Sequence, residues 1–359
     1  MCWLEVSRLD IIDADIRRAE TLPSRFYTDS NTFDEVISGF ANSWHFAAHE
    51  DQLSSVNALP LPHIEGMVRE PMLLTKDDEV RCISNVCTHR GMVVVNEPCS
   101  AGVLVCPYHG RSFSLDGCFR HMPEFEQVED FPTPADDLRQ FPLESWKGLL
   151  FTTIDGLDFE RWIAPLEERL GWLPVDSFRH APSRHREYTI EANWALYVDN
   201  YLEGFHIPYV HGDLHDVLDH DGYRTELFDG GVLQVGMARE GESCFDLPES
   251  SPDHGERVAA YYYWFHPGLM LNFYPWGLSV NLVVPLSVNR TAIVYHGFVG
   301  DESLLDMGAG GDLDKVEDED QFVVEATQRG VASRAYERGR YSPTRETGVH
   351  HFHRLLTRG

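Results

Sequence analysis

Positive charge is scarce in this sequence. Its 359 residues include 29 lysines and arginines against 58 aspartates and glutamates, which gives a formal net charge of −29 at pH 7. Because nucleic acids and anionic membranes are bound mainly through lysine and arginine, this balance argues against both as partners. One explanation is a salt-rich host cytoplasm, where salt screens the repulsion within a hydrated acidic surface.

Long apolar segments are also missing. No stretch approaches the 18 uninterrupted apolar residues of a spanning helix, and residues 1–20 mix charged and apolar residues where a signal peptide would be continuously apolar. The seven cysteines are an odd number and too sparse for a disulfide framework. We therefore expect a cytoplasmic protein without a membrane span, whose cysteines are free to bind a metal.

The length of the chain predicts two domains after a helical lead-in over residues 1–43. Short alternating runs separated by Gly, Pro and Asp turns over 44–155 indicate a small antiparallel β domain. The second domain covers residues 156–359 and begins with a helix-like stretch and a Pro-rich linker at 173–182. The remainder contains several predicted strands and two predicted helices, at about 193–207 and 312–338. This order favours an α+β domain with helices on one face of its sheet.

The first motif pairs a cysteine with a histidine twice. Cys87 and His89 are followed, after residues 90–105, by Cys106 and His109. Two thiolates and two imidazoles suit either tetrahedral zinc or a [2Fe-2S] cluster with two histidine ligands. Zinc fingers usually separate their cysteines from a helical histidine pair, whereas here each half is a loop with one of each. Two such loops can hold a cluster from opposite sides, and the motif resembles the Rieske domain.

The second motif lies in residues 193–213. Read as a helix, this segment places Asp199, Glu203 and His206 on one face. Pro208 ends the helix, and the turn beyond it can bring His211 back toward His206. Two histidines and one carboxylate form the facial triad of non-haem Fe(II) oxygenases, so a distant acid is required.

Together the two motifs resemble the α subunits of Rieske non-haem iron oxygenases, with a pattern closest to choline, betaine and carnitine monooxygenases. The resemblance covers the chain from TLPSRFY to VHHFHRLL and implies a helix-grip catalytic domain with His206 and His211 as iron ligands. It implies Asp320, eight residues before Gln328, as the third ligand, with the neighbouring acids as alternatives. Residues 317–319 are then interpreted as acids at a helix N-terminus.

The resemblance also implies a function. The chain would be a terminal oxygenase in which electrons from NAD(P)H pass through a flavin- or ferredoxin-type reductase to the cluster and then to a mononuclear Fe(II) that activates O2. The expected reaction is hydroxylation or oxidative demethylation of a small substrate, with a quaternary amine preferred. An aromatic-ring hydroxylase or O-demethylase of the same family is the alternative, and both mono- and dioxygenation stay open.

In this family a homotrimer places the cluster of one subunit beside the iron of the next. The resemblance therefore implies that Glu203 connects the two centres through His109 of one subunit and His206 of its neighbour. Asp199, one helical turn before Glu203, is a candidate outer support of the iron ligands. An acidic ferredoxin would be repelled by this surface unless salt screens the charge or a local basic patch forms the docking face, for which Arg81, Arg90 and Arg111 are the candidates.

The segment 258–277 is rich in aromatic residues. Strand alternation puts Tyr261, Tyr263 and Phe265 on one face, and with Phe273 and Trp276 they are candidates for the substrate pocket. Aromatic faces attract a trimethylammonium group, although the same residues serve a core equally well. The histidines at 350, 351 and 353 fit a strand better than a third metal site.

Overall fold

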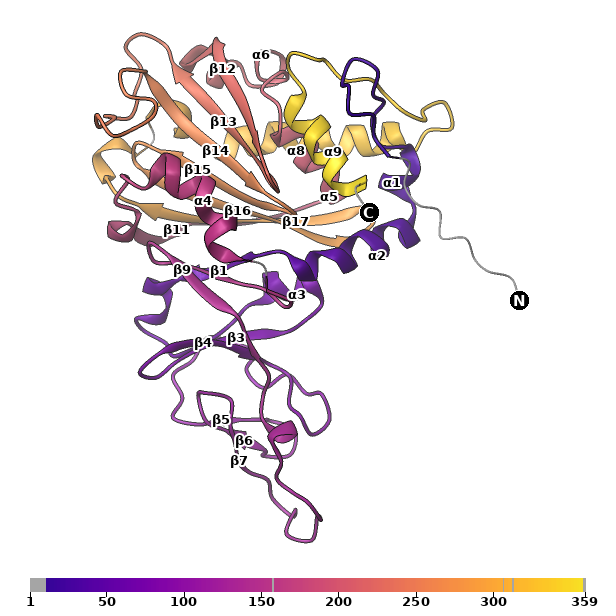
Figure 1. Cartoon of the computed structure of the whole chain (residues 1–359), viewed down its shortest axis with the longest axis vertical. Coiled ribbons are helices and arrows are strands. Elements are labelled where there is room, and N and C mark those ends of the chain that lie inside the picture. The colour runs from indigo at the N-terminus through magenta and orange to yellow at the C-terminus, as the bar shows by residue number, and fades with distance from the viewer. Residues whose placement is uncertain (1–10, 157, 306, 312, 358–359) are drawn as a thin grey trace. The chain divides into compact units, whose positions relative to one another are not determined.

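The structure is a computed structural model that describes residues 11–156, 158–305, 307–311 and 313–357 (Figure 1). The chain forms two compact units. The smaller unit is Ile37–His180, and the larger unit joins the N-terminal segment up to Val36 with the residues from Ala181 onward. Among the described residues, no helix combines the length and apolar character needed to cross a membrane.

The smaller unit is built from short antiparallel strands, as the frequent turn residues predict. Its three sheets are β1 (His45–His49), β10 (Leu149–Thr152) and β9 (Leu143–Trp146); β2 (Ala58–Pro60), β3 (Met72–Lys76), β4 (Val80–Ser84) and β8 (Gln140–Phe141); and β5 (Leu104–Val105), β6 (Ser112–Phe113) and β7 (Phe119–His121). Two helices accompany them, α3 (Pro62–Val68) and α4 (Phe159–Leu170).

The larger unit is organised around one seven-stranded sheet. Its strand order is β11 (Arg179–Ile190), β17 (Arg290–Val299), β16 (Gly277–Ser287), β15 (Leu269–Tyr274), β14 (Val258–Phe265), β13 (Gly231–Ala238) and β12 (Leu218–Phe228). The helices are α1 (Ser24–Thr28), α2 (Ser30–Ser38), α5 (Trp194–Tyr201), α6 (Ile207–Val210), α7 (Gly212–Val217), α8 (Leu313–Val331) and α9 (Thr347–Thr357). Helix α5 packs on β16 and against α8 and α9, so the predicted α+β class is confirmed.

The division into units differs from the predicted one at both boundaries. The N-terminal helices do not stand alone: α1 packs against α8, and the amide of Gln328 donates a hydrogen bond to the carbonyl of Tyr27. Helix α4 belongs to the smaller unit, where Phe159 packs against Trp44 at 5.0 Å between ring centroids. Composition marks where a helix begins, but only packing decides which core its apolar face joins.

The predicted helix over 193–207 is wrong at its C-terminal end. Helix α5 stops at Tyr201, and the carboxylate of Glu203 accepts hydrogen bonds from the backbone N–H groups of Phe205 and His206. Glu203 thereby satisfies donors that open a new turn, as an N-cap side chain does. A Cβ on Gly204 would lie 2.9 Å from the Tyr223 ring, so glycine permits this close approach.

The other predicted helix and the C-terminal strand also need correction. Helix α8 ends at Val331 instead of 338, and residues 350–353 lie in helix α9, which begins at Thr347. The ring Nε2–H groups of His350 and His351 donate to the carbonyls of Asp13 and Phe228, at 2.8 and 3.0 Å. These histidines anchor α9 to neighbouring segments, which gives them a structural role.

Burial of His45 predicts a loss of stability in acid. This histidine of β1 donates from Nε2 to the carbonyl of Phe40 at 2.8 Å, and burial lowers its pKa to about 4. Below pH 6.5 the unfolded chain takes up a proton that the folded chain refuses, so the free energy of unfolding falls until about pH 4. Between pH 7 and pH 5 we expect His45 to account for a decrease of about 2 kcal/mol.

Denaturant unfolding of the holoprotein at the two pH values measures this decrease. His45→Gln keeps a side-chain N–H donor and cannot titrate, so its free energy of unfolding should fall by about 2 kcal/mol less than that of the wild type. Equal decreases in both proteins would contradict the assignment.

Candidate metal centres

Two loops of the smaller unit present the cysteine and histidine pairs in the same way. In each loop the N–H of a glycine donates to the carbonyl of the cysteine four residues earlier: Gly91 to Cys87 at 3.0 Å and Gly110 to Cys106 at 3.1 Å. The glycines have φ values of +72° and +75°, in the left-handed region where glycine alone is unstrained. Two like turns therefore face one another, and neither carries its histidine on a helix, which fits a cluster better than a zinc finger.

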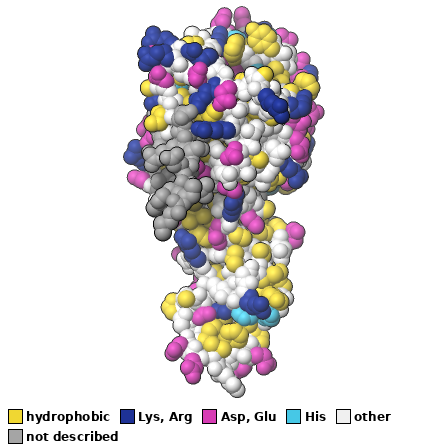
Figure 2. Space-filling view, turned by 90° about the vertical axis from the view of Figure 1, so that its right-hand side faces the viewer, with side chains coloured by type: hydrophobic (Ala, Val, Ile, Leu, Met, Phe, Trp, Pro, Cys, Tyr) yellow, Lys and Arg dark blue, Asp and Glu magenta, His cyan; other side chains and the backbone are white. Residues whose placement is uncertain are grey.

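The four donor side chains differ in burial. The thiols of Cys87 and Cys106 are each 2% exposed, whereas His89 is half-buried and His109 is exposed. The two imidazole rings lie 4.8 Å apart between centroids, and Figure 2 shows histidine side chains on the surface of this unit. Burial raises the pKa of the Cys87 thiol, and the adjacent Cys106 raises it further, so metal binding would release the thiol protons. The two buried thiols and the two more exposed imidazoles are a donor set that would hold a [2Fe-2S] cluster.

The predicted basic docking patch is wrong for Arg111. Its side chain is 2% exposed, pairs with Asp136 at 2.5 Å and lies under the ring of Phe119 at 4.9 Å. It therefore braces the cluster loops from within. The guanidinium of Arg81 is also neutralised, by Asp77 at 2.6 Å and by Glu79. Of the three candidates, only Arg90 keeps its charge exposed, beside the ring of Tyr108.

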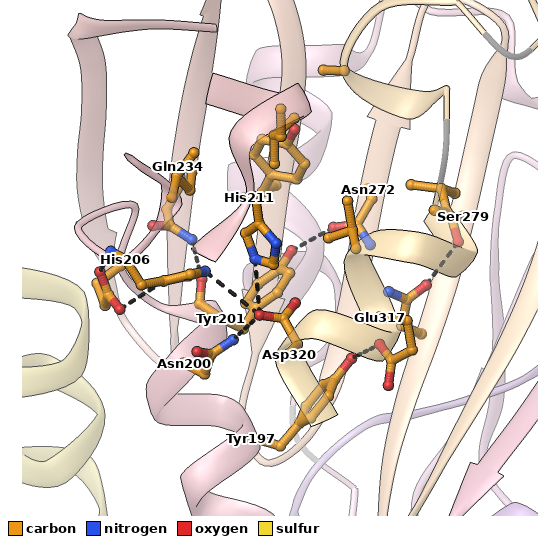
Figure 3. Close-up of a pocket in the computed structure, with 18 of the residues that line it drawn as sticks. Tyr197, Asn200, Tyr201, His206, His211, Gln234, Asn272, Ser279, Glu317 and Asp320 are labelled. Carbon is orange, nitrogen blue, oxygen red and sulfur yellow. Dashed lines mark hydrogen bonds and ion pairs between the residues drawn. The ribbon is translucent and has the colours of Figure 1, made fainter. Parts of the chain in front are cut away.

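The larger unit brings His206, His211 and Asp320 together. Their ligand atoms all lie within 4.8 Å of one another, with Asp320 Oδ1 at 3.0 Å from His211 Nε2 and 3.6 Å from His206 Nε2. Figure 3 shows the three side chains converging from the segment around α6 and from α8. Helix α8 thus supplies the distant acid, and the amide of Asn200 on α5 donates to it at 2.7 Å. Two imidazoles and one carboxylate fit a mononuclear Fe(II) with open positions.

Each ligand histidine is held by a second carboxylate. The Nδ1 of His206 lies 2.7 Å from Glu203 Oε1, and the Nδ1 of His211 lies 2.7 Å from Glu319 Oε2. An Nδ1–H group that donates to a carboxylate leaves Nε2 as the metal ligand and fixes the orientation of the ring. Sequence reasoning missed Glu319 in this role, although its place directly before Asp320 on one helix was the available indication.

Glu317 is also not at the helix N-terminus, where it was predicted to lie. It lies in the second turn of α8, is 3% exposed, and its carboxylate accepts hydrogen bonds from the hydroxyl groups of Tyr197 (2.6 Å) and Tyr295. Burial raises its pKa to about 7. Helix α8 therefore turns three acids inward: Glu317 toward two tyrosines, and Glu319 and Asp320 toward the two ring nitrogens of His211.

A cavity adjoins the three ligand side chains. Six tyrosines line it, from α5 and from strands of the sheet: Tyr197, Tyr201, Tyr223, Tyr262, Tyr274 and Tyr295. Neutral polar side chains complete much of the wall, namely Gln234, Asn272, Ser279 and Asn281. Among the described residues that line it, none is a lysine or an arginine. The cavity therefore offers aromatic faces and carboxylates to whatever lies beside the metal site.

Four of the five predicted pocket aromatics lie on the wrong face of the sheet, and the fifth, Trp276, lines a different cavity. Alternation along β14 is as expected, but Tyr262 faces the cavity, whereas Tyr261 and Tyr263 point to the opposite face and are fully buried. Phe265 and Phe273 belong to that opposite face too, where Phe265 packs against Phe228 and Phe273 packs against Tyr263. Trp276 lines a neighbouring polar cavity, with the guanidinium of Arg184 over its ring at 4.7 Å.

Asp199 does not support the iron ligands as predicted. Its carboxylate accepts a hydrogen bond from the hydroxyl of Tyr27 at 2.9 Å and lies 2.7 Å from the Nε2 of His353. The Nδ1 of His353 contacts the hydroxyl of Tyr341 at 2.6 Å. Asp199 therefore ties α5 to α1 and α9, away from the cavity.

Comparison with known proteins assigns both units. Residues 43–132 match the family described as Rieske [2Fe-2S] domain, and residues 176–358 match the family described as ring hydroxylating alpha subunit (catalytic domain). The second match spans about half of the chain and includes the three ligand side chains of the larger unit.

Individual relatives cover nearly the whole chain. The chloroplastic choline monooxygenase of Arabidopsis thaliana is 30% identical over 95% of this chain and 83% of its own length. The carnitine monooxygenase oxygenase subunit of Escherichia coli K12 is 31% identical over 96% of this chain and 94% of its own. A solved quaternary ammonium Rieske monooxygenase, described in terms of carnitine oxidation and inter-subunit electron transfer, superposes with a TM-score of 0.80 at 26% identity, covering 97% and 99% of the two chains.

Proposed function

The chain belongs to the ring-hydroxylating α-subunit family of Rieske oxygenases, and from this premise we propose that it oxidises a small quaternary amine. It is a terminal oxygenase component with a Rieske cluster and a mononuclear iron. The observation that carries the substrate proposal is the cavity beside His206, His211 and Asp320, which is lined by six tyrosines. A trimethylammonium group cannot donate hydrogen bonds and is held best by aromatic faces, at about 0.5–2 kcal/mol per ring.

When bound, the cluster would store an electron and the Fe(II) would activate O2. The protein orients the ligand histidines and the substrate, and it shields the reacting carbon from water. Glu203 and Glu319 hold the ligand histidines in one tautomer. Apolar side chains of the cavity wall keep bulk water from the reacting carbon, among them Ile207, Leu214 and Val316. The tyrosine faces hold the ammonium group, so that hydroxylation or oxidative demethylation takes place on a neighbouring carbon.

Glu203 has a further part in this proposal. Its carboxylate contacts His206, and the family relationship suggests that its other side meets His109 of a neighbouring subunit in a homotrimer. The inter-subunit electron transfer described for the superposed relative supports such an assembly. A flavin- or ferredoxin-type reductase that uses NAD(P)H would supply the electrons. The cytoplasm is the proposed compartment, supported by the absence of disulfides among the described cysteines.

Oxygen uptake with a panel of substrates tests the proposal. The holoenzyme, with a reductase and NADH, should consume O2 when choline, carnitine, γ-butyrobetaine or glycine betaine is added, and each O2 consumed should be matched by oxidised amine. Aromatic acids and aryl methyl ethers of similar size should give only the background rate. The reverse pattern would replace the quaternary amine with an aromatic substrate and leave the family assignment intact.

A further inference from the structure

The charge of the cavity narrows the substrate further. Resting on the proposed function, we propose that this enzyme selects amino alcohols of the choline type, whose only charge is the ammonium group, and disfavours amines that also carry a carboxylate, such as carnitine. Three features of the cavity favour such a substrate: an anionic group at one side, the lack of a lysine or arginine among the described residues of its wall, and a hydrogen-bond acceptor without a donor.

Glu317 provides the anionic group. It lines the cavity, and its partners Tyr197 and Tyr295 donate hydrogen bonds to the same carboxylate oxygen, Oε2. The other oxygen, Oε1, lies 3.2 Å from the amide of Gln321. Burial raises the pKa of Glu317, the donors on both oxygens oppose that rise, and a cation in the cavity would shift the carboxyl group further toward its ionised form. Tyrosine faces and a buried carboxylate together recognise an organic cation through both cation–π and Coulomb attraction.

A substrate carboxylate would meet no counter-charge in this cavity. Its described wall includes Glu203, Glu317 and Asp320 but neither lysine nor arginine. The nearest basic side chains in the wall of the neighbouring cavity are Arg184 and Arg186, and the two cavities share Glu317. Arg186 is already paired with Asp314 at 3.2 Å. A carboxylate directed toward these arginines would approach Glu317 in the wall that both cavities share, and like charges at close range repel.

Gln234 provides the unused acceptor. Its side chain is 1% exposed and its amide Nε2 donates to the carbonyl of Tyr201 at 2.6 Å, which fixes the amide orientation because a carbonyl oxygen can only accept. The opposite atom, Oε1, is buried and has no hydrogen-bond partner among the described residues, and Gln234 is one of the residues that line the cavity. Figure 3 shows Gln234 and Glu317 on opposite sides of Asp320. A buried acceptor without a donor is costly, and a substrate hydroxyl would satisfy it.

Equilibrium binding to the substrate-free holoenzyme tests the inference without turnover. Isothermal titration compares choline with 3,3-dimethyl-1-butanol, which has the same shape without the charge, and with L-carnitine and γ-butyrobetaine. We expect choline to bind at least about tenfold more tightly than each of the other three. Tighter binding of carnitine than of choline would overturn the proposal.

The decisive variant is Glu317→Gln. It should weaken choline binding about tenfold or more and change the binding of 3,3-dimethyl-1-butanol by less than about twofold, since only the charge is removed. Asp318→Asn is the matched control, because it removes one negative charge from the exposed face of the same helix and should leave both ligands unaffected. Equal weakening of both ligands by Glu317→Gln would show a shape effect and overturn the inference.

Failure of this inference differs from failure of the proposed function. Carnitine could support faster O2 uptake than choline, and Arg184→Gln could abolish that advantage. The carboxylate of carnitine would then be bound from the neighbouring cavity. This result would keep the proposed oxidation of quaternary amines and overturn the selection of choline-type substrates. If no quaternary amine supports O2 uptake, the proposed function falls. The titration of choline against its neutral isostere still decides whether Glu317 selects a cation.

Discussion

Replacement of Asp320 by alanine removes the mononuclear iron and abolishes product formation, while the Rieske cluster is retained. In the described part of the chain, Asp320 is the carboxylate that joins His206 and His211 in one potential metal-binding group, at 3.6 and 3.0 Å from their Nε2 atoms. Without it two neutral imidazoles are left, and a hard divalent iron binds two nitrogen donors poorly. We expect the turnover rate to fall by at least about 1,000-fold, since no O2 can be activated.

Iron analysis and spectroscopy of the cluster measure the outcome. Asp320→Ala should lose the iron of the larger unit and keep the visible and paramagnetic spectrum of the cluster, because the cluster loops belong to a separate compact unit. Glu319→Gln should keep iron with an affinity weakened by about 10- to 100-fold, since Glu319 supports a ligand and is not one. Iron loss in Glu319→Gln with retention in Asp320→Ala would exchange the two roles.

The second large effect is expected for Glu203→Gln. Glutamine has the same shape and can still accept the backbone N–H groups of Phe205 and His206, but it carries no charge. Both metal centres should therefore remain, whereas product formation should fall by about 100-fold or more. When the amide oxygen accepts the two backbone N–H groups, the amide nitrogen faces His206 Nδ1 and cannot accept its proton, and the neutral side chain cannot respond to the charge of a neighbouring cluster.

A single-turnover experiment separates electron transfer from geometry. The enzyme is reduced in advance, mixed with O2 and substrate, and the oxidation of its cluster is followed by absorbance. The rate should fall in Glu203→Gln and stay near the wild-type value in Glu319→Gln, which makes the same change of charge beside the other ligand histidine. Equal slowing in both variants would mean that histidine orientation alone explains the loss.

Sequence reasoning predicted the metal motifs well, because the residues of each motif are close together in the chain. A cysteine and a histidine in each of two like turns require only a local backbone shape, and the glycines at 91 and 110 supply it. Likewise His206 and His211 are close in the chain, so one short helix is enough to bring their rings near each other. Family membership follows from these local patterns and was recognisable without coordinates.

Choices between equivalent neighbours could not be predicted in the same way. Tyr261 and Tyr262 are adjacent in one strand, and alternation says that they face opposite sides without saying which side adjoins the metal site. The same choice arises for the four acids from Glu317 to Asp320. Successive side chains on a helix point about 100° apart, but the sequence does not say which of them points to the metal site. Glu317 accepts from Tyr197, whereas Glu319 and Asp320 contact the two different ring nitrogens of His211.

The amino-acid sequence by itself determined the two metal motifs, the class of the fold and the family, because these follow from residue types at short spacings. Only the tertiary structure decided which face of the sheet lines the cavity, where α5 ends, which unit α4 joins and which acid meets the histidines. The physical reason is that a period of two or of 3.6 residues sets the relative directions of side chains along one element, whereas their absolute direction is set by the elements packed against it.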